Sequence, residues 1–264
     1  MIKIFRVSKS YGKEKIIKNL SLEIKEGSVF GFLGPNGAGK TTTIKMLVGI
    51  SKPDLGKIEI NKNNPADVKT RQQIGFMPED PYFYDHLSGL ELIKFCYDLS
   101  ASSPTRSGIQ NDSIDSRFRG NDNNRTRINK KKTINKDNSN IFDKILSDVG
   151  LIKAKNQKIM EYSKGMKQRL GLAQAIVHNP QYIFLDEPLD GLDPIGRLEV
   201  KQIIKDLKKE GKTIFFNSHI LADVEEICDQ IGIINQGKLI YQGNIKKFCG
   251  KKTLEEAFVI NIKK

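Results

Sequence analysis

The feature that most restricts the fold of this chain is a glycine-rich segment between an apolar run and a helical pattern. The segment at 34–41 reads GPNGAGKT, the run at 29–33 reads VFGFL, and a helical pattern continues over 40–49. In this strand–loop–helix context the pattern predicts a phosphate-binding loop, or P-loop. Its glycines let backbone N–H groups turn toward the β- and γ-phosphates of a nucleotide, and the helix directs its positive end at the same anion.

The side chains of this loop predict a site for a nucleotide and Mg²⁺. Lys40 places a point charge at the terminal phosphates, and the Thr41 hydroxyl binds Mg²⁺. The predicted nucleotide-binding residues of this segment are Gly34, Pro35, Asn36, Gly37, Ala38, Gly39, Lys40, Thr41 and Thr42. The alternative is a glycine-rich turn without a nucleotide, but a match by chance is expected on the order of once in a hundred chains of this length.

Two adjacent carboxylates end a second apolar run, at 182–185. In P-loop enzymes an Asp at the end of a strand holds the Mg²⁺ shell, so Asp186 is predicted to bind the metal. Glu187 follows it and is predicted to act as general base toward the attacking water. The alternative is a solvated surface pair, which the four preceding apolar residues disfavour.

Strand and helix patterns alternate along the chain, which predicts an α/β core with a mostly parallel sheet. Ser88 and Glu91 form a predicted capping box at the start of one helix. The expected strands cover 20–24, 29–33, 57–60, 74–77, 182–185 and 213–216, with a hairpin at 231–234 and 238–241; the expected helices cover 40–49, 88–99, 166–177, 194–210 and 221–228.

The net charge of +13 raises the question of nucleic-acid binding. Residues 101–140 carry nine Lys or Arg and four Asp, which gives +5, and leave +8 over the other 224 residues. Because no stripe of arginines and aromatic residues appears, no specific nucleic acid is expected as a partner.

No apolar run approaches the roughly 20 residues that cross a bilayer, so no direct membrane span is expected. The three cysteines lie far apart in the sequence and form no paired motif, which fits a reducing compartment.

The middle of the chain differs in composition from the rest. Residues 101–140 contain six apolar residues in 40, together with five of the nine arginines. Such a segment buries too little apolar surface to fold alone. We therefore expect a disordered insertion over 101–140, with folded structure beginning again at Ile141. The alternative is a basic arm that binds acidic lipid headgroups or a partner.

The segment at 162–169, YSKGMKQR, resembles the signature segment of ATP-binding cassette (ABC) transporters, whose usual form is LSGGQ. Tyr162, Lys164 and Met166 replace the usual Leu, first Gly and Gln, whereas Ser163 and Gly165 are retained. With the P-loop and the acidic pair, the chain resembles the nucleotide-binding subunit of these transporters, except at 101–140. The resemblance implies that Ser163 and Gly165 contact ATP held by another subunit, in a closed homodimer or in a pair with a second ABC ATPase.

The same resemblance assigns further positions. Asp193 lies in the counterpart of the D-loop (189–194), which communicates across the dimer. His219 matches the switch histidine, which contacts the γ-phosphate and steadies Glu187. Tyr11 corresponds to the aromatic residue that stacks on adenine; the alternative is a core tyrosine in the first hairpin. Glu79 takes the place of the Q-loop glutamine and is implied to reach Mg²⁺.

The resemblance also predicts the architecture. It implies a P-loop NTPase core with a mostly parallel sheet, an N-terminal antiparallel β part and a helical subdomain with the signature segment. We expect the ATPase domain at 1–240, with the helical subdomain at about 80–165, and a short extension at 241–264.

These expectations combine into a function. The chain resembles the ATP-hydrolysing, Mg²⁺-dependent subunit that drives a separate membrane permease through dimer closure. Glu79 and the ending at 253–258 resemble export-type systems. The expected location is cytoplasmic, at the inner face of the membrane through the permease. The alternatives are an ABC-type ATPase that acts on ribosomes or DNA, and a cassette that the insertion has uncoupled.

Overall fold

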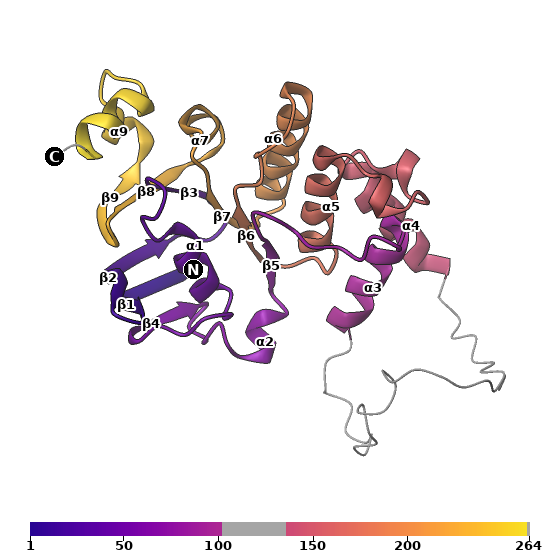
Figure 1. Ribbon diagram of the computed structural model, residues 1–264, viewed down its shortest axis with the longest axis horizontal. Coiled ribbons are helices and arrows are strands. Elements are labelled where there is room, and N and C mark those ends of the chain that lie inside the picture. Colours follow the sequence, from indigo (N-terminus) through magenta and orange to yellow (C-terminus); the bar gives the residue numbers. More distant parts are fainter. Residues whose placement is uncertain (102–135, 263–264) are drawn as a thin grey trace, which may run out of the picture.

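In the computed structural model, which describes residues 1–101 and 136–262, the strands form two sheets (Figure 1). The antiparallel sheet has the order β2-β1-β4, from strands β1 (Ile2–Tyr11), β2 (Glu14–Ile24) and β4 (Leu55–Ile60). The larger sheet has the order β5-β6-β7-β3-β8-β9, from β3 (Val29–Leu33), β5 (Ile74–Met77), β6 (Tyr182–Asp186), β7 (Thr213–Asn217), β8 (Gln230–Asn235) and β9 (Lys238–Asn244). Its strands are parallel except for β9, which pairs antiparallel with β8.

The helices of the described residues cover the larger sheet and build a separate helical part at one end (Figure 1). They are α1 (Lys40–Leu47), α2 (Val68–Arg71), α3 (Gly89–Ala101), α4 (Lys136–Asp148), α5 (Lys164–Ile176), α6 (Pro194–Lys209), α7 (Leu221–Ile227), α8 (Ile245–Cys249) and α9 (Leu254–Ile262), with 3₁₀ turns at Ile152–Ala154 and Ile159–Glu161. Within these residues no helix is both long and apolar enough to cross a membrane.

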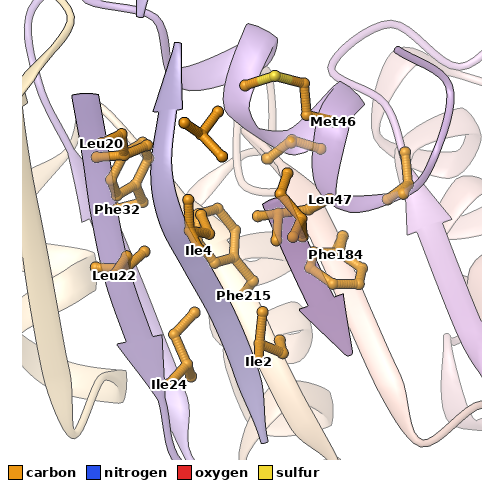
Figure 2. Packing of buried hydrophobic residues seen from close by; sticks show 14 of the residues in the cluster. Ile2, Ile4, Leu20, Leu22, Ile24, Phe32, Met46, Leu47, Phe184 and Phe215 are labelled. Carbon is orange, nitrogen blue, oxygen red and sulfur yellow. The ribbon is translucent and has the colours of Figure 1, made fainter. Parts of the chain in front are cut away.

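The first core fills the space between the two sheets. In β2, Leu20, Leu22 and Ile24 are buried while the residues between them are exposed, as the predicted alternation requires. They face the rings of Phe32 and Phe215 from the parallel sheet, and the helix after the P-loop packs beside them (Figure 2). This packing anchors α1, and with it the P-loop, between two layers.

A second core covers the opposite face of the parallel sheet. Every residue of β3, β6 and β7 is buried, because helices α6 and α7 cover the face that the first core leaves open. A strand that is buried on both faces reads as a continuous apolar run, which explains why these segments show no alternation.

The third core belongs to the helical part. Met166, Leu170, Ala173 and Val177 all pack into it, so the predicted helix face is confirmed. The capping box at α3 is also confirmed, because Ser88 N–H donates to Glu91 Oε2 at 2.8 Å. The helical part extends past the predicted limit of 165, since α5 completes its core.

The predicted fold class is confirmed, with two differences in boundaries. The limit at 240 falls inside β9, and Ile245 and Leu254 are buried in the same core as α7. The described part of 241–264 therefore packs as part of the domain rather than as an extension. Helix α4 begins at Lys136 and so includes the last five residues of the predicted insertion. The prediction of disorder otherwise falls on 102–135, outside the described residues.

Candidate nucleotide-binding site

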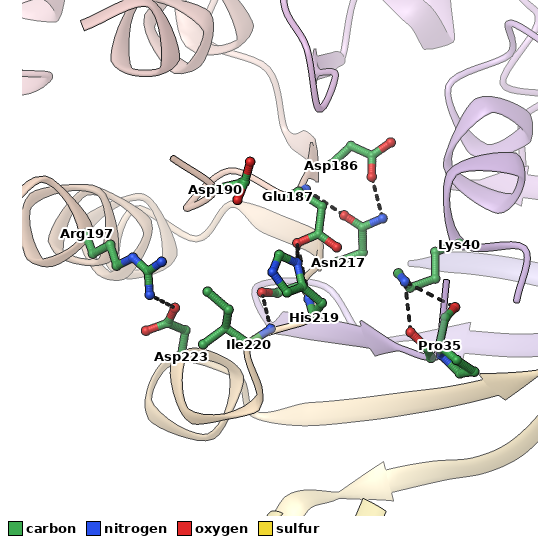
Figure 3. Close-up of polar contacts among 12 residues, drawn as sticks. Pro35, Lys40, Asp186, Glu187, Asp190, Arg197, Asn217, His219, Ile220 and Asp223 are labelled. Carbon is green, nitrogen blue, oxygen red and sulfur yellow. Dashed lines mark hydrogen bonds and ion pairs between the residues drawn. The ribbon is translucent and has the colours of Figure 1, made fainter. Parts of the chain in front are cut away.

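The P-loop, the acidic pair and His219 follow three neighbouring parallel strands. β7 lies between β3 and β6, and all three run in the same direction. The carboxyl ends of such strands share one edge, where α/β proteins commonly bind ligands. Lys40, Asp186, Glu187 and His219 accordingly gather in one region (Figure 3).

Two glycines of the P-loop, Gly34 and Gly39, occupy positions where a side chain would clash or be strained. An added Cβ on Gly34 would lie 2.3 Å from the Ile234 carbonyl oxygen, and Gly39 has a φ of 107°. The Lys40 ammonium is buried in the loop, where it donates to the carbonyl oxygens of Gly34 at 2.8 Å and Pro35 at 3.4 Å. A bound phosphate would offer this ammonium a charged acceptor in place of two neutral ones.

Helix α1 begins immediately after the loop. Gly39 at its N-cap has no side chain that could cap the first turn, so the N–H groups there remain suited to an anion. Thr41 and Thr42 lie half-buried in this turn. The Thr41 side chain lowers the pKa of Asp186, so the P-loop helix and the end of β6 influence each other at this point.

Asp186 has the surroundings of a metal ligand. Its side chain is 2% exposed, and Asn217 Nδ2 donates to its Oδ1 at 2.5 Å. Burial raises the pKa of Asp186, hydrogen bonds from Asn217 and Thr41 oppose that rise, the charge of Glu187 adds to it, and the charge of Lys40 lowers it. A carboxylate and a hydroxyl are oxygen ligands of the kind Mg²⁺ prefers, so Asp186 and Thr41 fit a magnesium site.

Glu187 is held by contacts from three directions. Its Oε2 accepts from the His219 backbone N–H at 3.1 Å and lies 2.8 Å from His219 Nδ1. Its own N–H donates to Asn217 Oδ1 at 2.8 Å, and its carbonyl accepts from Gln168 Nε2 at 3.2 Å. The backbone of Glu187 has a φ of 50°, a strained conformation for a non-glycine residue that functional sites often contain. These contacts hold the Glu187 carboxylate in the region of the sheet edge where the P-loop also lies.

The signature and D-loop residues cap helices. Ser163 precedes α5 and its Oγ accepts from Met166 N–H at 3.2 Å, with Gly165 in the first turn. Asp193 precedes α6 and its Oδ1 accepts from Gly196 N–H at 2.7 Å. Among the described residues, the side-chain hydrogen bonds of Ser163 and Asp193 stay within their own helices, and none joins them to the P-loop.

The two remaining predicted residues are exposed. Tyr11 ends β1 with 51% of its surface accessible, and Lys9 Nζ lies 5.4 Å from its ring centre, so the alternative of a core tyrosine is wrong. Glu79 lies two residues beyond β5, whose Met77 pairs with Leu185 of β6. Glu79 therefore follows the strand next to Asp186.

Two buried amides at this site were not predicted from the sequence. Asn217 bridges Asp186 and Glu187, and Gln168 holds the Glu187 carbonyl. One sequence feature could have identified Asn217 as a site residue, because it is a polar residue that ends an apolar strand two positions before His219. No such feature marks Gln168, since a glutamine on a helix is usually solvated.

Comparison with known proteins decides the family. Residues 17–190 match the family described as ABC transporter. The chain belongs to the ABC transporter family. The predicted resemblance is thereby confirmed, and the ribosome or DNA alternative receives no support from the relatives described below.

Several relatives in this family are named for transport. The chain is 39% identical over 243 residues to the bacitracin transport ATP-binding protein BcrA of Bacillus licheniformis, covering 91% of this chain and 68% of that protein. It is 35% identical over 258 residues to the lantibiotic transport ATP-binding protein SrtF of Streptococcus pyogenes, covering 98% and 96%. It is also 39% identical to an uncharacterized ABC transporter ATP-binding protein of Synechocystis sp., of which it spans 59% while 90% of this chain is covered.

Solved structures show the same fold. One, titled as an ATP binding subunit of an ABC transporter, matches with a TM-score of 0.80 and 24% identity over 99% of both chains. Another, titled as a dimeric ATP-binding cassette in a post-hydrolysis state bound to ADP and Pi, matches with a TM-score of 0.75 and 23% identity over 92% of this chain and 98% of that one. At this identity the likeness concerns the fold.

Proposed function

We propose that this chain is the Mg²⁺-dependent ATP-hydrolysing subunit of an ABC exporter. The observation that carries the proposal is the Glu187 carboxylate, which His219 holds at the sheet edge where the P-loop and Asp186 also lie. An acidic side chain that is oriented by a histidine beside a phosphate-binding loop is suited to activate water against a phosphate.

The P-loop and Asp186 bind and position the nucleotide in this proposal. Lys40 leaves the carbonyl oxygens of Gly34 and Pro35 and donates to the terminal phosphates. Asp186 and Thr41 hold Mg²⁺, with Glu79 as a further oxygen ligand from the neighbouring strand. When bound, Mg²⁺ neutralises charge on the phosphate oxygens. Tyr11 offers its exposed ring for stacking on adenine.

Glu187 performs the proton transfer. It accepts a proton from water while the water oxygen bonds to the γ-phosphorus, and the bond to the ADP oxygen breaks. His219 keeps Oε2 in place during this step, and both the imidazole and the backbone N–H contribute. The products are ADP and phosphate.

Ser163, Gly165 and Asp193 act toward a second ATPase subunit in this proposal. Ser163 is exposed at the start of α5, and its own hydrogen bond stays in that helix, so its hydroxyl can face another molecule. The structural relative bound to ADP and Pi is titled as a dimer. The second subunit is a copy of this chain or a related ATPase.

The proposed role in transport and export is based on the names of the relatives. BcrA and SrtF carry names of bacitracin and lantibiotic transport. We infer that closing and reopening of the dimer drive a separate permease, which holds the chain at the cytoplasmic face of the membrane. The transported compound is selected by that permease.

The proposal is tested by capturing the tagged chain from detergent-solubilised native membranes and measuring its ATP hydrolysis with Mg²⁺ or with EDTA. We expect a multi-spanning protein at near-equal stoichiometry, and phosphate release that EDTA abolishes. Ribosomal proteins or nucleic acid in place of a membrane protein would contradict the transport role. Phosphate release that EDTA leaves unchanged would contradict the Mg²⁺ site.

A further inference from the structure

Two helices flank the Glu187 region and are joined by ion pairs. Helix α6 begins directly after the D-loop, and α7 begins two residues after His219. Lys201 and Lys205 of α6 both contact Glu226 of α7, at 2.6 and 2.7 Å. Since the lysines are one turn apart on α6, they hold the Glu226 carboxylate between them and join the two helices at this point.

Among the α6 residues that pair with α7, Arg197 lies nearest the D-loop. It lies in the first turn of α6, and its Nε donates to the Leu192 carbonyl oxygen at 3.3 Å. Its Nη1 lies 3.8 Å from Asp223 Oδ2 in α7 (Figure 3). One planar guanidinium therefore contacts the D-loop backbone on one side and α7 on the other, which a lysine ammonium could not reproduce with the same geometry.

One carboxylate oxygen of Asp223 lacks a hydrogen bond within the described residues. Its side chain is 8% exposed, and its Oδ1 pairs with Lys201 Nζ at 3.1 Å. Its Oδ2 is buried and accepts no hydrogen bond from any described residue. A buried acceptor without a hydrogen bond is costly. A shift of about 1 Å that brings Arg197 within hydrogen-bond distance would remove this cost.

These contacts close a ring around the general base. Asp190 N–H donates to the Glu187 carbonyl at 3.1 Å at the start of the D-loop. The D-loop leads to Arg197, Arg197 faces Asp223, and α7 leads back to His219, which contacts the Glu187 carboxylate. A displacement of either helix is therefore transmitted to Glu187 from two sides.

We propose that Arg197 is a positioning residue for ATP hydrolysis. It joins the D-loop to α7 through Asp223 and thereby holds His219 against Glu187. The hydrogen bond from Arg197 to Asp223 completes when the D-loop moves toward α7 during closure of the site. This inference rests on the proposed function and adds a residue that neither the P-loop nor the signature segment contains.

The test compares Arg197→Gln with Lys205→Gln. Both remove one cation between α6 and α7, but Lys205 lies two turns farther from the D-loop. We expect Arg197→Gln to lower kcat for ATP hydrolysis roughly 10- to 100-fold, because small misplacements of reacting groups cost rates of this order. We expect its KM for MgATP, and both constants of Lys205→Gln, to stay within about two-fold of wild type.

A third variant separates positioning from simple structural support. Arg197→Lys keeps a positive charge near Asp223. The lysine ammonium lacks the planar guanidinium that also donates to the Leu192 carbonyl oxygen. We expect Arg197→Lys to recover the Tm of wild type without recovering kcat. Should Arg197→Gln fail to fold, the comparison of Arg197→Lys with wild type carries the test.

The outcomes are distinct. Wild-type kcat in Arg197→Gln, an equal loss in Lys205→Gln, or full kcat in Arg197→Lys would overturn the positioning role while leaving the proposed function intact. A wild-type chain that hydrolyses no ATP with Mg²⁺ would overturn the proposed function, and this inference with it.

Discussion

His219 contacts the same carboxylate oxygen of Glu187 twice, through its ring nitrogen at 2.8 Å and through its backbone N–H at 3.1 Å. The Glu187 side chain is 10% exposed, whereas that of His219 is 53% exposed. The histidine thus reaches inward from the surface to a buried carboxylate. Removal of the imidazole leaves the backbone contact in place, so the two contributions can be separated by mutation.

His219→Ala should lower kcat by about 10- to 100-fold and leave ATP affinity within about two-fold, because the backbone N–H still holds Glu187 in part. Steady-state hydrolysis and fluorescent-nucleotide titration measure the two quantities. His86 is exposed and lies beside Tyr84 outside the site, so His86→Ala serves as the matched control. Equal activity of both variants would show that the His219 ring has no part in turnover.

Lys40→Ala should abolish detectable nucleotide binding, because the buried ammonium is the charge that the P-loop presents to the phosphates. Titration with a fluorescent ATP analogue checks this. Lys45 lies exposed on the same helix, and Lys45→Ala should bind as wild type does. Tight binding by Lys40→Ala would contradict the assignment of the loop.

Asp186 links the site to pH-dependent stability. Burial raises the pKa of Asp186 above its ordinary value of 3.8, so the folded state binds its proton more tightly than the unfolded state does. Stability contributed by this group is therefore present at low pH and is lost as the pH rises from about 4 through the raised pKa. The ionised carboxylate then opposes folding unless a cation lies beside it.

Asp186→Asn should consequently raise Tm at pH 7 in the absence of Mg²⁺, with a gain that shrinks as the pH falls toward 4, because the neutral amide still accepts from Asn217 without the cost of a buried charge. Scanning calorimetry across pH, with and without MgATP, measures this. The variant should also lose the stabilisation that MgATP gives the wild type. A Tm below that of wild type at pH 7, with a deficit that shrinks as the pH falls toward 4, would instead show that the charge of Asp186 stabilises the fold.

The parts of this structure that could be predicted from the sequence are those encoded by neighbouring residues. The P-loop, the apolar strand before Asp186 and the capping box at Ser88 each depend on contacts within a few residues, and each element lies where it was expected. The alternation in β2 likewise shows directly which face is buried.

The contacts that were missed join distant parts of the chain. Asn217 bonds to residues of another strand, and Gln168 reaches Glu187 from the helical part. The domain boundary at 240 was misplaced for the same reason, because burial of Ile245 and Leu254 depends on α7 rather than on their own pattern. Such contacts follow from tertiary packing, which a local pattern does not encode.

Glu187→Gln tests the central claim most directly. The amide keeps the size of the side chain and removes its ability to accept a proton. With saturating MgATP in a single-turnover experiment, we expect nucleotide binding like that of wild type and hydrolysis slower by ~10²–10⁴, the usual contribution of a general base. Hydrolysis within a few-fold of wild type, with binding retained, would contradict the assignment of Glu187 as the base and with it the proposed mechanism.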